Sequence, residues 1–305
     1  MSALWMRRVV MVVLVCAGLA GMGMQAAQAA AVRLEVPQRV ARGDAFLLRV
    51  WCDAITGQGQ APGLVQVQWR GKSLPVPLEP NAQNAAEKGA SVAVILLSVP
   101  VDEKADGPLP LVVRLPQGER AQTQVALYSR ERPVQKLTVE GKFVNPPAKE
   151  KARIAADRRK VRAVAARYTP QRAWGLPLLR PVPGEVSSLF GLKRVFNGEP
   201  RSVHKGLDLR GAQGEPIRAV ADGEVALVDN LYFSGNAVYV DHGLGVVTAY
   251  LHMSKTLVQP GQSVRRGDTL GLVGATGRVT GPHLHFTLLV QGVHADPLPL
   301  LEQEK

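Results

Sequence analysis

The sequence predicts a mostly β protein: an N-terminal immunoglobulin-like β-sandwich over residues 31–143, a basic helical linker over residues 144–172 and a C-terminal antiparallel β domain over residues 173–305. Short alternating apolar segments fill the first stretch, an Ala-, Lys- and Arg-rich run fills the second, and glycine-rich turns separate apolar segments in the third. A chain of 305 residues with 46% hydrophobic content can form two ordinary hydrophobic cores.

The first residues have the pattern of a secretory signal peptide. Arg7 and Arg8 precede an apolar run over residues 9–20, and small residues with the sequence A-Q-A follow at 27–29. We therefore expect a signal peptide over residues 1–29, cleaved after its last residue. The apolar run is shorter than the ~20 residues that span a bilayer. A periplasmic or secreted protein with no stable membrane anchor after cleavage is the expectation.

The two cysteines predict no disulfide in the mature chain. Cys16 lies within the predicted signal peptide, and Val15 stands before it where a lipoprotein signal has a small residue, so we expect no lipidation. Cys52, in R-V-W-C-D, is then the last cysteine left and is expected to be a small apolar strand residue.

The predicted sandwich repeats short apolar or alternating segments between turn residues, a spacing typical of an immunoglobulin-type antiparallel fold. Residues 31–143 contain no histidine and no plausible metal cluster. Two roles stay open for this domain: a spacer that presents the C-terminal domain, or a module that binds or covers its site until it is displaced. The segments are V-R-L-E-V, A-F-L-L-R-V-W-C, L-V-Q-V-Q-W, A-V-I-L-L-S-V, L-P-L-V-V-R-L, T-Q-V-A-L-Y and V-Q-K-L-T-V.

The predicted linker carries a strongly basic helix over residues 149–167, where eight Lys and Arg residues face only Glu150 and Asp157. Such a run is either a solvated face or a contact surface for anionic envelope polymers. The net charge of +12 and the pI near 10.0 favour an attraction of the second kind, which salt should weaken. We expect no nucleic-acid partner, because the chain has an export signal and no recognised nucleic-acid module.

Four side chains in two distant motifs predict a zinc site. His204 and Asp208 lie in V-H-K-G-L-D-L, and His283 and His285 lie in G-P-H-L-H-F. Alternate residues of a strand point to one face, so each pair can aim the same way and two neighbouring strands can assemble a site. A catalytic zinc ion has three protein ligands and one open position. His204, Asp208 and His285 supply three, which leaves His283 near the metal to handle protons.

The segment from about residue 180 to residue 301 resembles the lysostaphin/LytM-type zinc metalloendopeptidases, which cut peptides in bacterial cell-wall peptidoglycan. The resemblance is carried by ordered motifs, namely S-S-L-F-G, H-K-G-L-D-L, G-E-P-I-R-A-V-A-D-G-E-V, G-N-A-V-Y-V-D-H-G-L-G, Y-L-H-M-S and V-R-R-G-D-T-L-G-L-V-G-A-T-G-R-V-T-G-P-H-L-H-F.

This resemblance implies an antiparallel β LytM-type metallopeptidase domain with Zn²⁺ as its only cofactor. It implies His204, Asp208 and His285 as the metal ligands and His252 and His283 as the catalytic histidines. The implied function is a secreted zinc endopeptidase that hydrolyses peptide cross-links of peptidoglycan, and we favour the D-Ala–diaminopimelate bond. The alternative is a non-catalytic LytM-type regulator that binds and activates a cell-wall amidase. Such regulators have lost metal ligands, whereas this chain keeps the full set.

The expected mechanism uses metal-activated water. Zinc lowers the pKa of bound water to about 7 and polarises the scissile carbonyl. We hypothesise that His283 or His252 takes the water's proton, that both imidazoles stabilise the oxyanion, and that one returns the proton to the leaving amine. Which of the two is the general base stays open.

One position departs from some relatives, which place a tyrosine just before the first ligand. The bulky or polar candidates that we identify between Phe190 and His204 are Phe196, Asn197, Arg201 and Ser202.

Two histidines are expected outside the site. His242, in V-D-H-G-L-G, is interpreted as a solvated residue of a hairpin turn, and His294 as peripheral. We expect the metal on one face of an antiparallel sheet, in a groove walled by loops at residues 190–203 and 229–236.

Overall fold

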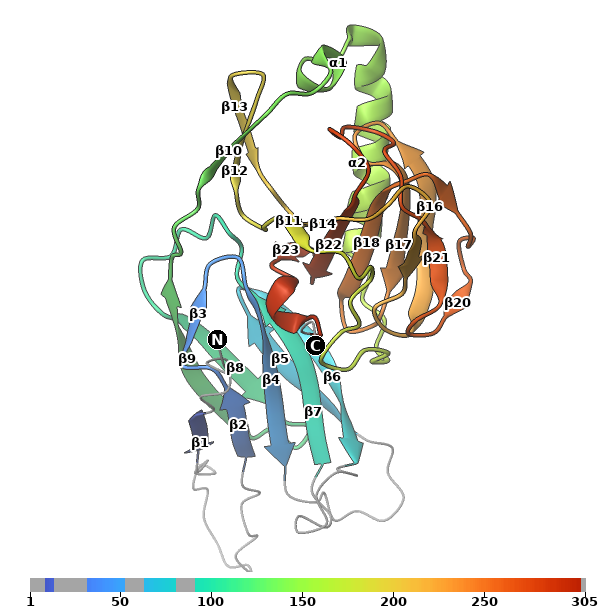
Figure 1. The fold of residues 1–305 in the computed structure, drawn as a ribbon. Helices are drawn as coiled ribbons and strands as arrows, with labels where there is room; N and C mark the ends of the chain where they lie inside the picture. Colours follow the sequence, from blue (N-terminus) through green and yellow to red (C-terminus); the bar gives the residue numbers. More distant parts are fainter. Residues whose placement is uncertain (1–8, 14–31, 53–62, 81–90, 303–305) are drawn as a thin grey trace, which may run out of the picture. The chain divides into compact units, whose positions relative to one another are not determined.

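The computed structural model describes residues 9–13, 32–52, 63–80 and 91–302, without the side chains of residues 9–13 and 201–202 (Figure 1). The chain divides into two compact units. The second unit consists of Gly43–Ala45, Ser98–Asp102 and Arg130–Lys305, and the first unit consists of the remaining residues up to Ser129. The predicted mostly β fold class is confirmed.

The first unit contains nine strands in the order β1-β2-β4-β7-β6-β5-β8-β9-β3. Strand β6 pairs with both β5 and β7 and so joins the group β1-β2-β4-β7 to the group β5-β8-β9-β3. The strands are β1 (Val9–Val13), β2 (Val32–Val36), β3 (Arg39–Ala41), β4 (Ala45–Cys52), β5 (Leu64–Trp69), β6 (Lys72–Pro80), β7 (Ser91–Ser98), β8 (Leu109–Arg114) and β9 (Arg120–Tyr128). The finer immunoglobulin-like assignment stays a prediction.

The strands of the first unit form because their apolar residues alternate. In β2, Val32, Leu34 and Val36 are buried, whereas the residues between them are partly exposed. Each such strand covers one face with apolar side chains. Cys52 is 1% exposed, as expected of a small apolar strand residue.

Strand β1 comes from the segment that the sequence predicts to be a signal peptide. Residues 9–13 pair with β2 in an antiparallel register. The rest of the predicted signal peptide lies outside the described residues. Its cleavage therefore stays a prediction, and under that prediction β2 becomes the edge strand of the mature protein.

The second unit is built on an eight-stranded sheet in which β11-β14-β22-β18-β17-β16-β20 are neighbours and β23 pairs with β22. Two three-stranded sheets, β10-β12-β13 and β15-β21-β19, accompany it. The strands are β10 (Val134–Leu137), β11 (Val186–Ser188), β12 (Lys193–Phe196), β13 (Glu199–Val203), β14 (Leu207–Leu209), β15 (Pro216–Arg218), β16 (Gly223–Leu231), β17 (Gly235–Asp241), β18 (Val246–Met253), β19 (Lys255–Thr256), β20 (Ser263–Val264), β21 (Thr269–Leu272), β22 (Leu284–Val290) and β23 (Val293–Ala295).

The helices of the second unit are α1 (Gly141–Val144), α2 (Lys151–Ala165) and the short 3-10 helices η3 (Ala148–Glu150) and η4 (Leu298–Leu300). None of the helices in the described ranges has the length and apolar character needed to cross a membrane.

Helix α2 packs against the large sheet. Val164, Val161 and Ala165 contact a buried cluster that includes Tyr239 and Leu289. The predicted basic helix therefore exists, but it covers one face of the sheet and belongs to the second compact unit. The sequence suggests a separate linker, because charged residues dominate this segment. A few apolar residues are nevertheless enough for the helix to pack on the sheet.

The prediction of a loop at residues 190–203 is wrong, because most of this segment forms a β-hairpin. Strands β12 and β13 pair with each other, and β10 pairs in parallel with β12. The turn between β12 and β13 uses Asn197 and Gly198, both with positive φ, as hairpin turns commonly require. The hairpin lies directly before His204, the first predicted ligand.

Candidate metal centre

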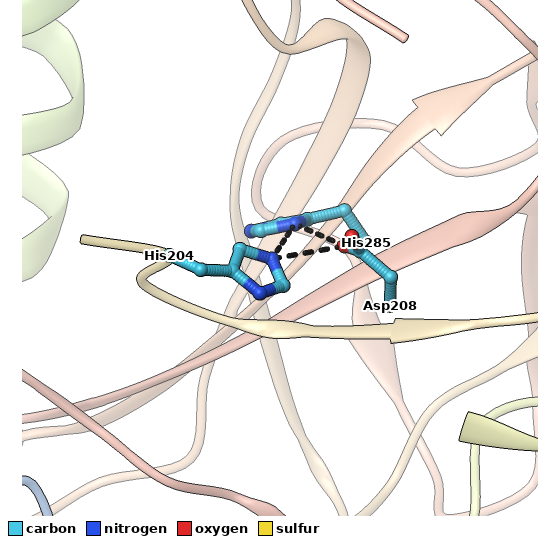
Figure 2. A group of neighbouring side chains, drawn as sticks. All are labelled: His204, Asp208 and His285. Carbon is cyan, nitrogen blue, oxygen red and sulfur yellow. Dashed lines mark hydrogen bonds and ion pairs between the residues drawn. The ribbon is translucent and has the colours of Figure 1, made fainter. Parts of the chain in front are cut away.

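Strand pairing brings the two predicted ligand motifs together. Strand β14 pairs with β22 in an antiparallel register, and Asp208 lies directly opposite His285. His204 lies in the connection between β13 and β14, and Figure 2 shows its ring turned toward the other two side chains. The sequence interpretation placed His204 on the same strand as Asp208. The structure instead achieves the convergence with a turn.

Three atoms form a compact cluster in Figure 2. His204 Nε2 lies 3.0 Å from Asp208 Oδ1 and 3.1 Å from His285 Nδ1, and His285 Nδ1 lies 2.7 Å from the same carboxylate oxygen. The ligand atoms of the three residues all lie within 4.8 Å of one another. Two imidazole nitrogens and one carboxylate oxygen are donors that zinc accepts. The cluster therefore fits a single divalent cation.

Burial shapes the protonation of this cluster. Burial lowers the pKa of His285 to about 4, despite the opposing effect of Asp208, so the ring is neutral at neutral pH. Burial alone would raise the pKa of Asp208, but the close His204 and His285 rings bring it well below its usual value. A neutral imidazole and an ionised carboxylate are the forms that bind a metal.

A backbone contact orients His204. Its Nδ1 donates to the carbonyl oxygen of Leu189 at 2.7 Å, which leaves the lone pair of Nε2 directed at the cluster. On the other side, a Cβ added at Gly206 would lie 2.5 Å from His285 Nε2 and 2.6 Å from the Phe286 carbonyl oxygen. The glycine in H-K-G-L-D is thus needed so that β14 can approach His285.

His252 reaches the cluster through an unusual backbone conformation. Leu251 lies opposite His285 in the register of β18 and β22, so regular alternation would place His252 on the opposite face of the sheet. Its φ of 66° breaks that alternation. The His252 ring consequently lies 5.8 Å from the His285 ring and 5.1 Å from the His283 ring, measured between centroids.

Both additional histidines donate a hydrogen bond from Nδ1 to a backbone carbonyl oxygen. His252 Nδ1 donates to the Thr276 carbonyl oxygen at 2.8 Å, and His283 Nδ1 donates to that of Gly281 at 2.9 Å. In the neutral form of each ring, Nε2 is then a proton acceptor. His283 Nε2 lies 3.8 Å from Asp208 Oδ1. Burial, together with the neighbouring His285 and His283 rings, holds the pKa of His252 well below its usual value.

The structure also places a residue at the cluster that the sequence interpretation missed. Arg194, on β12, lies 2.6 Å from Asp208 Oδ2. Of the four candidates between Phe190 and His204, Phe196 is buried, and Asn197 bonds the backbone of Val139. The side chains of Arg201 and Ser202 lie outside the described atoms. No local sequence signal identifies Arg194, because its contact depends on the hairpin.

The expectation that His242 is solvated is wrong. Its ring is fully buried, with Nδ1 2.6 Å from the Asp222 carbonyl oxygen and Nε2 2.7 Å from Thr248 Oγ1. Residues 169–173 cover the turn, since Leu244 N donates to the Thr169 carbonyl oxygen and Ala173 N to that of His242. The local sequence V-D-H-G-L-G does not indicate that a segment this far away in the chain covers the turn. His242 is a structural residue.

The sequence model of peptidase family M23 matches residues 202–297, a range that contains all five predicted site residues. This segment of the second unit therefore resembles peptidase family M23. The expected resemblance to the lysostaphin/LytM-type enzymes is thereby confirmed.

Named relatives of this segment come from Vibrio cholerae. The chain is 38% identical over 136 residues to the peptidoglycan DD-endopeptidase ShyC, covering 45% of this chain and 27% of ShyC. It is 44% identical over 108 residues to the peptidoglycan DD-endopeptidase ShyA, covering 35% of this chain and 25% of ShyA. The matched segments span about a quarter of the length of these relatives.

One solved structure matches well beyond the M23 segment. A crystal structure of a peptidase M23 from Pseudomonas aeruginosa is 29% identical and aligns with a TM-score of 0.62. The alignment covers 85% of this chain and 94% of that one. The similarity in fold therefore includes much of the first unit as well as the second unit.

Proposed function

We propose that this chain is a zinc endopeptidase that hydrolyses peptide cross-links of bacterial peptidoglycan, with His204, Asp208 and His285 as metal ligands and His252 and His283 as catalytic residues. The observation that carries the proposal is the combination of a three-donor cluster with two further imidazoles around it. A metal-binding role alone needs only the first group.

Zinc bound here would supply a water molecule of lowered pKa and would polarise the scissile carbonyl. The chain's own residues supply proton handling. His252 and His283 each keep Nδ1–H on a backbone carbonyl, so Nε2 can accept a proton and later return it to the leaving amine. The firm backbone bonds also hold both rings in one tautomer and orientation.

We propose peptidoglycan as the substrate, and the D-Ala–diaminopimelate bond as the target, because ShyC and ShyA are named peptidoglycan DD-endopeptidases. A substrate of this kind requires the chain to reach the cell envelope. The signal peptide proposed for residues 1–29 would deliver it to the periplasm or the exterior.

We also propose that helix α2 contacts anionic envelope polymers. Its Lys and Arg side chains are exposed, and only some of them serve the fold: Lys160 pairs with Asp229 at 2.6 Å, and Arg153 Nη2 donates to Asn230 Oδ1 at 2.9 Å. Binding of the protein to vesicles of an anionic lipid should weaken as the salt concentration rises. Binding that is insensitive to salt would contradict the electrostatic contact.

The test of the main proposal is digestion of purified peptidoglycan by the zinc-loaded protein, with products identified by mass. Walls with D-Ala–diaminopimelate bridges and walls with glycine bridges are digested in parallel. We expect released monomers from the first substrate, and none with the His283→Ala variant. Intact cross-links together with stimulation of an added amidase would instead establish the regulator.

A further inference from the structure

Arg194 and Asp208 form a largely buried ion pair at the proposed metal site. Arg194 Nη2 lies 2.6 Å from Asp208 Oδ2, and the side chains are 14% and 8% exposed. The other carboxylate oxygen, Oδ1, faces His204 and His285. The two oxygens of Asp208 thus have separate tasks, one toward the metal cluster and one toward the guanidinium.

The guanidinium group is itself held by two further polar side chains. Arg194 Nε donates to Gln135 Oε1 at 3.2 Å, and Nη2 approaches Ser188 Oγ at 3.3 Å. Ser188 Oγ also donates to Gln135 Oε1 at 3.1 Å and lies 3.3 Å from His204 Nδ1. One planar group therefore serves three acceptors, which an ammonium group on a flexible stem reproduces poorly.

Gln135 comes from outside the segment that matches the M23 family. It lies on β10, directly beside Arg194 in the parallel register of β10 and β12. Backbone bonds at both ends fix this strand, since Lys193 N donates to the Pro133 carbonyl oxygen and Asn197 N to that of Leu137. Strand β10 therefore determines where the guanidinium group can lie.

We infer that Arg194 is a positioning residue that presents Asp208 to the metal through Oδ1 alone, and that β10 supports it through Gln135. This inference rests on the proposed metal site. A carboxylate that is held on one oxygen cannot rotate away from the metal or bind it through both oxygens. Groups that orient a ligand in this way typically contribute 10-fold to 100-fold in metal affinity.

The test measures zinc affinity by competition with a chromophoric chelator, and the visible absorption of the Co²⁺-substituted protein, which reports ligand geometry. We expect Arg194→Met to weaken zinc binding by about 10-fold to 100-fold and to change the Co²⁺ spectrum. Arg194→Lys should recover part of the affinity, and Gln135→Leu should weaken binding by a smaller factor. Lys193→Met, an exposed cation on the same strand, is the matched control and should bind zinc within about twofold of wild type by the ordinary tolerance of surface sites.

Two results separate this inference from the proposed metal site. If the wild type binds no zinc, or if His285→Ala still binds the zinc that the wild type binds, the metal site itself is refuted, and this inference with it. If the wild type binds zinc and Arg194→Met matches it in affinity and spectrum, only the positioning role is refuted. Should Arg194→Met fail to fold, wild-type values for both Arg194→Lys and Gln135→Leu refute the role.

Discussion

The two compact units of this chain differ in where their polar side chains lie. Among the described residues, all eleven buried polar or charged side chains belong to the second unit, and the first unit buries only apolar ones. Buried polar groups cost free energy unless they are hydrogen-bonded, so a unit that serves stability alone avoids them. In the second unit four of them, Ser188, His204, Asp208 and His252, lie at the candidate site. Substitutions should therefore affect stability in the first unit and chemistry in the second.

The largest expected effect comes from removing one member of the metal cluster. His285→Ala takes away one of three donors and should reduce bound zinc to a trace and peptidoglycan hydrolysis to the background rate. Metal analysis of the purified protein and mass analysis of the digest check both results. Full zinc occupancy in this variant would show that the cation binds elsewhere.

Removing a proton-handling ring should separate chemistry from metal binding. His252→Ala and His283→Ala should each lower kcat/KM by about 10²-fold to 10⁴-fold, the usual contribution of a general acid or base. Zinc content should stay at one equivalent, since neither ring belongs to the three-donor cluster. Full hydrolytic activity in both variants would end their assignment as catalytic residues.

A core substitution in the first unit should show the opposite pattern. Leu48 is fully buried in β4, so Leu48→Ala should lower the free energy of unfolding by about 2–5 kcal/mol. Denaturant unfolding measures this loss. Below the unfolding transition, zinc affinity should equal that of wild type. A matching loss of zinc affinity would mean that the two units are not energetically separate.

The smallest expected effect is a pH dependence in the second unit. Burial lowers the pKa of His294 to about 4, and its Nδ1 has no hydrogen-bond partner among the described residues. The unfolded state then binds more protons than the folded state between pH 4 and pH 6.5, so stability falls as pH decreases through this window. The difference reaches about 3 kcal/mol at most.

His294→Leu should remove this part of the pH dependence. Denaturant unfolding of wild type and variant at several pH values measures it, and parallel stability curves would contradict the burial of a neutral ring. The sequence interpretation places His294 outside the site, and the structure places it on β23 with a partly buried side chain.

The sequence predicted the parts of the site that depend on residue identity and strand alternation. His204, Asp208 and His285 converge as expected, because ligand chemistry leaves few alternatives for those side chains at that spacing. The mostly β architecture was predicted from the alternation of apolar and polar residues along the strands. The roles of the five site residues remain proposals.

The features that the sequence did not predict depend on long-range contacts. The contact of Arg194 requires a hairpin that positions it and a strand from beyond the M23 segment that supports it. The burial of His242 requires residues 169–173 to cover its turn. Neither contact has a local pattern: Gln135 lies 59 residues from Arg194, and the segment that covers His242 comes from another part of the chain.

The left-handed backbone at His252 has a consequence for protein engineering. A β-carbon makes this conformation unfavourable, and glycine or asparagine would adopt it with less strain. Selection of variants for heat resistance alone should therefore enrich those residues at this position and discard the imidazole. A thermostability campaign on this protein needs a simultaneous screen for the proposed hydrolysis, or it will favour well-folded but inactive variants.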